Sequence, residues 1–273
     1  IAQQNYHIGN FEANTKQIID AIEQAKQEGA DIILFSEMSV CGYPARDFVE
    51  FNDFINQCYA SIDAIRKVAD TIGVLIGSPA HNTNEKGKPL YNAAFFLYEQ
   101  KIQAEIHKTL LPTYDVFDEY RYFEPNTVFK TIELNEKRVA VTICEDLWNE
   151  EDDPMYTFSP LEKTGDGKID LVINIAASPF DFNHREKRIS ILQRNAAKFK
   201  SPIVYVNHAG AQNDLVFDGG SMVLDAAGSL LYEASYFEES LSICDLTSSQ
   251  SSDISIAQSK NERISQALVC GIR

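Results

Sequence analysis

Short runs of apolar, mostly β-branched residues recur along this chain and alternate with segments of helical spacing. Val139 to Ile143 is one such run, and its length and composition predict a buried strand. Similar runs predict strands at Ile32 to Phe35, Val74 to Gly77, Leu171 to Ile175 and Ile203 to Asn207. Strands that alternate with helices favour an α/β fold with a mixed sheet and helices outside it.

Helices, hairpins and short strands complete the predicted pattern. Apolar residues three and four apart predict helices from Phe11 to Glu28 and from Phe51 to Ile72, each followed by a glycine that would end it. A third helix, rich in Arg and Lys, is predicted from His184 to Phe199. The predicted hairpins pair Asn92 to Tyr98 with Lys101 to His107, and Phe129 to Leu134 with Arg138 to Ile143. Short closing strands are predicted at Met222 to Asp225, Leu230 to Tyr232 and Leu241 to Asp245.

The composition is that of an ordinary globular protein, with 44% hydrophobic and 23% charged residues among 273. In an α/β fold this length is compatible with one large domain. The net charge of −16 argues against nucleic acid as a partner, since phosphate binding needs clustered Lys and Arg. No apolar run reaches the roughly 18 residues of a membrane span, and no signal peptide is visible. Five cysteines without a C-x-x-C pair indicate reduced thiols in the cytoplasm.

A cysteine followed by two acids ends the strand Val139 to Ile143. The carboxyl ends of strands in α/β sheets are where ligands and catalytic side chains are usually displayed. Cys144 at this point is therefore a candidate nucleophile. A buried structural cysteine is an equally good interpretation of this segment alone, because free cysteines are among the most buried residues.

Two more predicted strands also end in charged residues. Glu37 follows Ile32 to Phe35, and Lys108 follows Lys101 to His107. Each placement alone is ordinary: a Glu that caps the following turn, a solvated Lys at a strand end, and a Cys in the core. Three strand-end placements together are hard to assign to chance, although periodicity alone does not prove that the three residues meet in space.

Longer motifs surround these residues. They are Ser36-Glu37-Met38 with Cys41-Gly42-Tyr43-Pro44, Lys108 to Phe123, Ile143 to Trp148, Asn174 to Phe180, and Asp218 to Ser221. Together they resemble the motifs of the nitrilase, or carbon-nitrogen hydrolase, superfamily, in the form found in glutamine-dependent NAD synthetases. The resemblance covers residues 1 to about 246. It implies an α-β-β-α sandwich with mixed sheets and outer helices, which commonly pairs with a second copy into a homo-oligomer.

The resemblance also implies a role for each strand-end residue. Cys144 would attack the substrate amide, and Glu37 would act as general base and then as general acid. Lys108, with the backbone N–H of Glu145, would stabilise the oxyanion. Glu119 matches a second family glutamate that would hold Lys108 or the attacking water. From the residues alone, a salt bridge inside the surrounding charge cluster explains Glu119 equally well.

Five positions match those that line the glutamine pocket in this subfamily. They are Tyr114, Phe117, Glu145, Ser178 and Arg185. Aromatic residues at such positions are also what a hydrophobic core would contain. Arg185 would meet the substrate carboxylate, although the sequence around it departs from the usual Gly-Lys form of the family.

Other chemistries fit the sequence less well. The five histidines form no H-x-x-x-H or H-x-H pair, so no metal site is expected. The chain contains neither a G-x-G-x-x-G nor a G-K-[ST] phosphate loop. We therefore expect no cofactor in this domain, and we expect ATP and Mg to bind in a separate synthetase domain.

The domain organisation follows from one polar stretch near the end of the chain. We expect residues 1–246 to form the amidohydrolase domain and residues 247–260 to form a linker. Residues 261–273 have helical spacing and resemble the first helix of the ATP-using synthetase domain. A C-terminal arm that packs on a neighbouring subunit is the other interpretation.

Three functions remain after this reasoning. The first is hydrolysis of the glutamine side-chain amide, with the ammonia passed to the chain's own synthetase domain for the amidation of deamido-NAD. The second is a free-standing amidase or carbamoylase that acts on another small amide. The third is a non-catalytic scaffold, which the presence of Glu37, Lys108 and Cys144 argues against.

Overall fold

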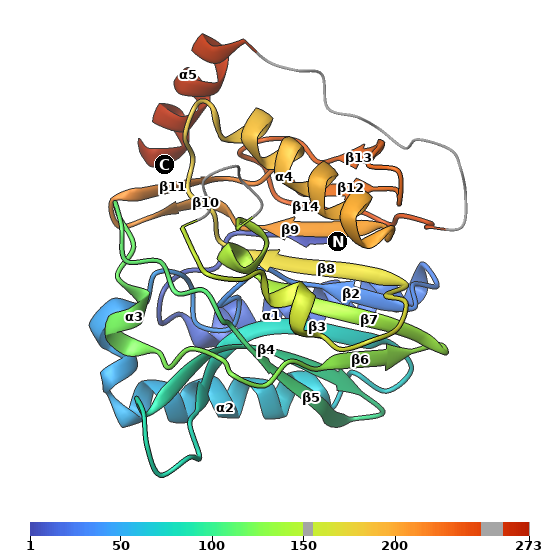
Figure 1. The fold of residues 1–273 in the computed structure, drawn as a ribbon. Helices are drawn as coiled ribbons and strands as arrows, with labels where there is room; N and C mark the ends of the chain where they lie inside the picture. Colours follow the sequence, from blue (N-terminus) through green and yellow to red (C-terminus); the bar gives the residue numbers. More distant parts are fainter. Residues whose placement is uncertain (150–154, 247–258, 273) are drawn as a thin grey trace.

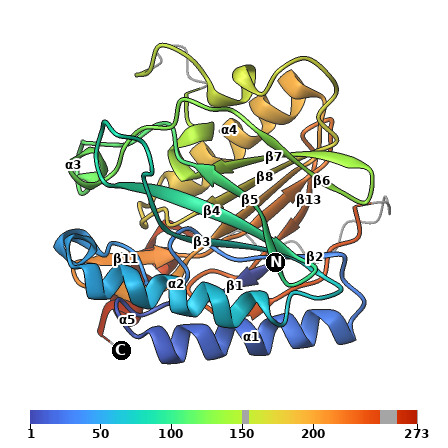
Figure 2. The same cartoon turned by 90° about the horizontal axis from the view of Figure 1, so that it is seen from below.

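Two β-sheets stack between outer helices in the computed structural model, which describes residues 1–149, 155–246 and 259–272 (Figure 1). The smaller sheet has the order β2-β3-β4-β5 and the larger one the order β13-β12-β9-β8-β7-β6. Helices α1 and α2 lie side by side on the outer face of the smaller sheet, and α4 covers the larger one (Figure 2). The predicted α-β-β-α sandwich is confirmed.

The strands of the two main sheets and the helices have the following bounds. The smaller sheet contains β2 Ile32–Leu34, β3 Gly73–His81, β4 Leu90–Tyr98 and β5 Lys101–His107. The larger sheet contains β6 Thr131–Leu134, β7 Lys137–Ile143, β8 Leu171–Ala176, β9 Ile203–Asn207, β12 Met222–Leu224 and β13 Leu230–Glu233. The helices are α1 Phe11–Gln27, α2 Asn52–Arg66, α3 Glu119–Tyr122, α4 His184–Phe199 and α5 Lys260–Ile272.

Short elements connect these layers. The 3₁₀ turns are η1 Arg46–Glu50, η2 Cys144–Leu147 and η3 Pro160–Lys163. Two small antiparallel sheets pair β1 Ala2–Gln3 with β14 Ser240–Leu241, and β10 Ala209–Gln212 with β11 Leu215–Asp218. In the main sheets, β2 runs parallel to β3, and β7, β8 and β9 run parallel to one another. Both sheets are therefore mixed.

Alternation of side chains along β3 explains why the sheet lies between two apolar layers. Val74 and Ile76 pack in the cluster beneath α1 and α2, whereas Leu75 packs in the cluster between the two sheets. Successive side chains of a strand point to opposite faces, so a strand buried on both faces must be apolar throughout. This is why the sequence shows continuous apolar runs and not alternation with polar residues.

The structure departs from the predicted elements in several places. Helix α2 ends at Arg66 and not at Ile72, and the backbone N–H groups of Val68 and Ala69 bond carbonyls three residues back, so the chain leaves the helix through tight turns. Ile72 is nevertheless buried, so its apolar side chain packs from a turn. The hairpin β10–β11 was not predicted, since its first strand is short and contains two alanines, a glycine and a glutamine, none of them β-branched or aromatic. The strand predicted at Leu241 to Asp245 is reduced to β14, which pairs with β1.

The C-terminal helix agrees with the helical spacing noted near the end of the chain. Helix α5 packs on the hairpin β10–β11, and Arg263 donates a hydrogen bond to Glu186 of α4 at 3.3 Å. Most of the predicted linker, residues 247–258, lies outside the described residues. None of the helices in the described ranges combines the length and apolar character that a bilayer crossing requires.

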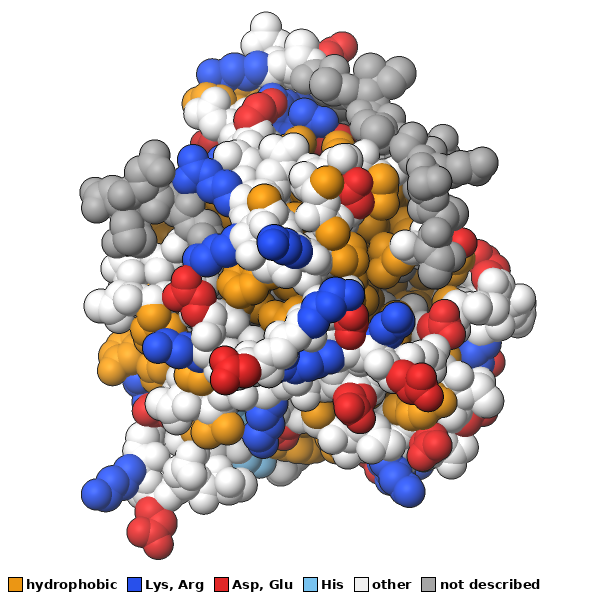
Figure 3. All heavy atoms as spheres, turned by 45° about the vertical axis from the view of Figure 1, so that its right-hand side comes forward, with side chains coloured by type: hydrophobic (Ala, Val, Ile, Leu, Met, Phe, Trp, Pro, Cys, Tyr) orange, Lys and Arg blue, Asp and Glu red, His pale blue; other side chains and the backbone are white. Residues whose placement is uncertain are grey.

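The surface carries charges of both signs. On the face shown in Figure 3, Lys and Arg side chains alternate with Asp and Glu around a patch of hydrophobic side chains. That face presents no continuous basic stripe of the kind that phosphate backbones bind.

One glycine brings β3 against the turn that follows β2. A Cβ on Gly77 would overlap the backbone nitrogen of Met38 and would lie 2.7 Å from the carbonyl oxygen of Ser36. The close approach lets the backbone N–H of Val40 reach the Gly77 carbonyl at 3.1 Å. Gly77 is therefore required by packing between two backbones.

We predict that Gly77→Ala lowers the free energy of unfolding by about 1–3 kcal/mol, the usual cost of overpacking a well-filled site. Gly73→Ala in the same strand is the matched control, because its Cβ would meet only side-chain atoms at 3.1 Å or more. Urea denaturation of both variants measures the difference. Equal losses would mean that contact with the turn after β2 is not the cause.

Candidate active site

The ends of β2, β5 and β7 meet at one edge of the two stacked sheets. Glu37 lies in the turn after β2, Lys108 directly follows β5, and Cys144 opens η2 directly after β7. The strand-end placement predicted for these three residues is therefore observed. All three side chains are buried, with 0% of Lys108 and 5% of Cys144 exposed to solvent.

A buried lysine lies between two carboxylates. The Nζ atom of Lys108 is 2.8 Å from Oε1 of Glu37 and 2.8 Å from Oε1 of Glu119. Glu119 begins the short helix α3, so the loop after β5 returns to the same lysine. The two carboxylates engage two of the three ammonium hydrogens, which leaves one donor for a bound molecule.

Three further groups fix the two carboxylates. Asn92 of β4 donates through Nδ2 to Oε1 of Glu37 at 2.6 Å and to Oε2 of Glu119 at 3.3 Å. The hydroxyl of Tyr43 donates to Oε1 of Glu119 at 2.8 Å. The backbone N–H of Ala177, just beyond β8, donates to Oε2 of Glu37 at 3.1 Å.

Cys144 stands on a turn that a neighbouring carboxylate stabilises. Its φ angle is +44°, in the left-handed region that non-glycine residues rarely adopt. Asp146 accepts from the backbone N–H of Ile143 at 3.1 Å, and from those of Thr109 and Leu110 at 2.9 Å each. One buried carboxylate thus joins the turn that bears Cys144 to the segment directly after Lys108.

The carbonyl oxygen of Cys144 is also held. Asn174 of β8 donates to it at 3.3 Å and donates to the hydroxyl of Thr142 at 3.0 Å. The strained residue is therefore supported from the central strand on one side and by Asp146 on the other. Its backbone position is fixed before any substrate binds.

Glu145 forms a second polar cluster beside the cysteine. The hydroxyls of Tyr114 and Tyr156 both donate to its Oε1, at 2.8 Å and 3.1 Å. Neither bond uses Oε2. Phe117 packs edge-on against Tyr114, with 5.6 Å between the ring centroids. Tyr114 and Phe117 come from the loop after β5, whereas Glu145 and Tyr156 come from η2 and the loop after it. Of these four residues, only Tyr156 was absent from the sequence prediction.

The other two predicted pocket residues have different surroundings. Ser178 is buried and exchanges hydrogen bonds with the side chain of Asn207, at 2.8 Å and 3.3 Å. Arg185 donates to both carboxylate oxygens of Glu233 on β13, at 2.8 Å and 2.7 Å. The contacts described for Arg185 include none of the other candidate residues, because this ion pair occupies its guanidinium group.

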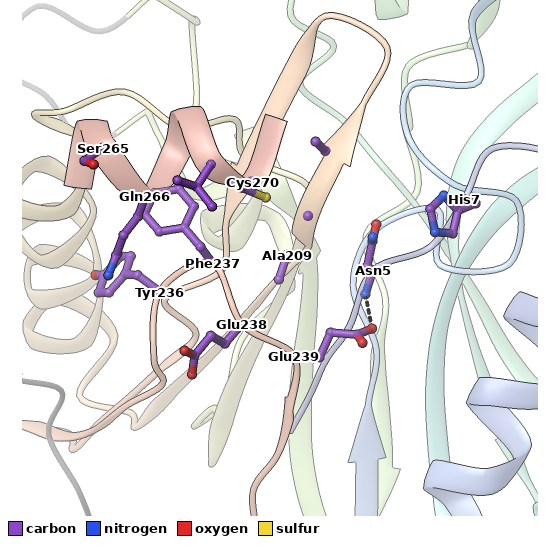
Figure 4. A pocket seen from close by; sticks show the side chains of 13 residues that line it. Asn5, His7, Ala209, Tyr236, Phe237, Glu238, Glu239, Ser265, Gln266 and Cys270 are labelled. Atoms are coloured by element: carbon purple, nitrogen blue, oxygen red, sulfur yellow. Dashed lines mark hydrogen bonds between the residues drawn. The ribbon is translucent and has the colours of Figure 1, made fainter. Parts of the chain in front are cut away.

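Two cavities differ in their relation to this site. A cavity of about 320 Å³ is lined by Tyr43 and Glu119, so it borders the carboxylate cluster. A larger cavity of about 530 Å³ lies between α5, β10 and the segment before β14 (Figure 4). None of the candidate catalytic residues lines the larger one. Of these two cavities, the smaller one therefore borders the candidate catalytic residues.

Burial and the neighbouring charges act in opposite directions on this cluster. Burial alone would lower the pKa of Lys108, but the carboxylates of Glu119 and Glu37 raise it well above its usual value. Burial raises the pKa of Glu119 to about 7, with Lys108 opposing and Glu37 adding to the shift. The lysine therefore stays charged, while the carboxyl group of Glu119 titrates near neutral pH.

The cysteine itself rests as a thiol. Burial first, and then the negative charge of Glu37, raise the pKa of Cys144 well above its usual value, against the attraction of Lys108. A nucleophile of this kind needs a base at the moment of attack, unlike a cysteine that forms a stable thiolate. Burial likewise raises the pKa of Asp146 to about 6, although three backbone N–H groups favour its charged form.

Comparison with known proteins identifies the family. The family model for carbon-nitrogen hydrolases matches residues 1–254. The chain belongs to the carbon-nitrogen hydrolase family. A glutamine-dependent NAD(+) synthetase from Synechocystis sp. is 35% identical over 284 residues, which are 100% of this chain and 51% of that protein. The protein of the same description from Thermotoga maritima is 33% identical over 246 residues. That alignment includes 90% of this chain and 41% of the Thermotoga maritima protein.

Solved structures agree with this assignment. A glutamine-dependent NAD+ synthetase from Acinetobacter baumannii superimposes with a TM-score of 0.86 at 30% identity, over 99% of this chain and 50% of that one. A nitrilase-superfamily amidase from Nesterenkonia, at 22% identity and a TM-score of 0.72, shares the fold. This carbon-nitrogen hydrolase chain thus spans about half the length of the curated relatives it matches.

Sequence reasoning missed five polar residues of this carbon-nitrogen hydrolase site. They are Tyr43, Asn92, Asp146, Tyr156 and Asn174. Tyr43, Asp146 and Asn174 stand inside motifs that the sequence had singled out, so their position was a usable signal. Asn92 is one polar residue inside the apolar strand β4, which is a second usable signal. Tyr156 has no such mark, because only the folded chain brings it to Glu145.

The raised pKa of Glu119 predicts a dependence of stability on pH. The folded protein holds this proton more tightly than the unfolded chain, whose pKa is near 4.5. The contribution of Glu119 to stability is therefore complete below about pH 4.5 and is lost as the pH rises through about 7. Glu119→Gln removes this dependence.

We expect the free energy of unfolding of Glu119→Gln, relative to the unsubstituted protein, to rise by about 1–3 kcal/mol between pH 5 and pH 8, as a shift of this size implies. Urea titrations at both pH values measure it. Glu136→Gln, at an exposed turn, is the control and should show no such change. A constant difference at both pH values for Glu119→Gln would contradict the assignment.

Proposed function

We propose that this chain hydrolyses the side-chain amide of glutamine. The single observation that carries the proposal is the buried Glu37–Lys108–Glu119 ion cluster beside a cysteine on a strained strand-end turn. Attack on an unactivated amide needs a nucleophile, a base that removes its proton, and a fixed positive charge that stabilises the oxyanion. The thiol, the carboxylate and the ammonium of this cluster can supply these three functions. Relatives of the same family that match this chain are described as glutamine-dependent.

The proposed reaction has two halves. Sγ of Cys144 attacks the amide carbon while its proton moves to Glu37, and the negative charge gathers on the amide oxygen. The free N–H of Lys108 and the backbone N–H of Glu145 stabilise that oxygen. Glu37 then gives the proton to the departing nitrogen, the C–N bond breaks, and ammonia leaves a thioester. Water attacks the thioester with Glu37 again as base, which releases glutamate and restores the thiol.

Glutamine is favoured over other amides by the cluster around Glu145. The two tyrosine hydroxyls occupy one carboxylate oxygen, and the other remains for a cationic group. We propose that this group is the α-ammonium of glutamine. Phe117 and Ser178 form walls of the same pocket. Arg185 is the weakest of the proposed substrate contacts, because Glu233 already pairs with it.

The ammonia would serve a synthetase in the same polypeptide. The relatives that match this chain are about twice its length and are described as NAD(+) synthetases. We propose that a C-terminal synthetase domain binds ATP and Mg and uses the ammonia to amidate deamido-NAD, while the hydrolase half uses no cofactor. A homo-oligomer in the cytoplasm is proposed on the family resemblance and on five free cysteines.

Cys144→Ala should abolish glutamine hydrolysis, with kcat reduced by at least about 10⁴-fold, as for other essential nucleophiles. Its melting temperature should change little, because only one sulfur atom is removed. Cys244→Ala, on another part of the chain, is the matched control and should retain full activity. Ammonia release from glutamine is the measurement, and wild-type release by Cys144→Ala would exclude this nucleophile.

Glu145→Gln should distinguish glutamine from a similar amide. Removing the carboxylate charge costs about 1.5–3 kcal/mol of contact with an ammonium group, which is about 10- to 100-fold in kcat/KM for glutamine. Glutaramate, which is glutamine without its α-amino group, should be hydrolysed by the variant as well as by the unsubstituted protein. Equal losses on both substrates would mean that Glu145 does not bind the ammonium and would favour an amidase for another substrate.

A further inference from the structure

Asn92 hydrogen-bonds all three charged members of the ion cluster, and among residues 1–149, 155–246 and 259–272 no other side chain is recorded with bonds to both carboxylates except that of Lys108. Its side-chain nitrogen reaches Glu37 and Glu119, at 2.6 Å and 3.3 Å. Its main-chain carbonyl accepts the backbone N–H of Lys108 at 2.8 Å. It lies in the middle of the smaller sheet, in β4, and only 1% of it is exposed. Its position is therefore set by the sheet and not by the site.

The orientation of its amide group is determined by the two carboxylates. Both oxygens that face Nδ2 are acceptors, so the amide nitrogen and not the amide oxygen must point toward them. Oδ1 then faces away and has no hydrogen-bond partner among the described residues. A buried acceptor left without a partner is unfavourable. The two N–H bonds to carboxylates, which are stronger than bonds between neutral groups, outweigh that loss.

The hydrogen bonds form a closed ring. Lys108 bridges Oε1 of Glu37 and Oε1 of Glu119, while Asn92 bridges the same Oε1 of Glu37 and Oε2 of Glu119. Two carboxylates face one ammonium, so one negative charge remains uncompensated when both are ionised. A neutral double donor is the group that can hold two carboxylates close together without adding charge. A second cation there would compete with Lys108 for them.

We propose that Asn92 is a positioning residue that holds the carboxylates of Glu37 and Glu119 on either side of Lys108 and favours the ionised form of Glu119, so that Glu37 is free to take the proton of Cys144. The inference rests on the proposed function, since it assigns Glu37 the role of base. The charged or titratable groups that face this ring come from four segments besides the two glutamates themselves. They are Lys108 from the end of β5, Tyr43 from the turn after β2, Cys144, Glu145 and Asp146 from η2, and Tyr156 from the loop that follows.

The consequence is a defined effect of pH. Without the amide donors, Glu119 should hold its proton to a higher pH, because nothing replaces the lost hydrogen bond in a buried site. The inactive, protonated form then persists further toward neutrality. The acid limb of the activity profile should move upward, while the affinity for substrate, which depends on Glu145 and Tyr114, should stay the same.

The experiment compares Asn92→Ala and Asn92→Asp with the unsubstituted protein. Asn92→Asp keeps the shape of the side chain but removes its NH₂ donors. For both variants we expect kcat for glutamine to fall about 10- to 100-fold and KM to change less than about threefold. The acid limb of kcat/KM should move to higher pH by about one unit, which corresponds to the loss of one or two charge-assisted hydrogen bonds. Asn14→Ala is the control, since Asn14 is an equally buried asparagine that bonds only the backbone, at His7 and Val40.

A second readout does not depend on the substrate. The rate at which iodoacetamide alkylates Cys144, located by peptide mapping, should show the same upward shift of its acid limb in both Asn92 variants. For Asn14→Ala we expect a lower melting temperature, with the acid limbs of kcat/KM and of the alkylation rate unchanged. The same result for the Asn92 variants would mean that Asn92 only packs, and it would overturn the inference. If the unsubstituted protein does not hydrolyse glutamine, the proposed function fails, and the alkylation profiles still decide the role of Asn92.

Discussion

The ammonium of Lys108, buried between two carboxylates, is the interaction on which the rest of this structure depends. A charge with no exposed surface is tolerated only where partners surround it, and removal of one partner would leave an uncompensated charge in the interior. Each partner comes from a different segment: Glu37 from the turn after β2 and Glu119 from α3. The smaller sheet and the loop after β5 therefore have to assemble in one arrangement for the lysine to be buried at all.

The second constraint is the connection between the two sheets. Cys144 belongs to the larger sheet and Lys108 to the smaller one, yet Asp146 bonds backbone N–H groups beside both. Ala177, at the end of β8 in the larger sheet, reaches across to Glu37. Stacked sheets interact mainly through apolar side chains, which specify distance more than register. These polar contacts add the directionality that brings the nucleophile and the base to the same edge.

The electrostatics of the site follow from this enclosure. Burial raises the pKa values of Cys144 and of Glu119, whereas the same burial leaves Lys108 charged because two anions accompany it. The site therefore rests as a thiol near an ammonium that lies between two carboxylates. Such a thiol reacts slowly with small oxidants and electrophiles until it is deprotonated, since the thiolate is the reactive species. A substrate that fits between Lys108 and Cys144 would change this balance by placing a polar amide where the carboxylates otherwise dominate.

Much of this arrangement could be predicted from the sequence, because it depends on local patterns. Continuous apolar runs determined the strands of a two-sided core, and the charged or thiol residue after three of the predicted strands marked the site edge. Apolar spacing predicted α1 and α4 nearly to the residue, but it extended α2 past Arg66, since Ile72 is buried from a turn and spacing does not distinguish the two. Motif resemblance added Glu119 and the residues around Glu145.

Contacts between distant segments were decided only by the tertiary structure. Asn92 and Tyr156 acquire their roles from neighbours 55 and 11 residues away, and neither stands in a motif that marks it. Arg185 matched a pocket position in sequence, yet the fold gives its guanidinium to Glu233, 48 residues further on. The sequence by itself determined which elements form and which chemical groups end the strands, since these depend on neighbouring residues. The tertiary structure decided which of those groups meet, because burial of charge and the pairing of polar atoms are satisfied only in the assembled fold.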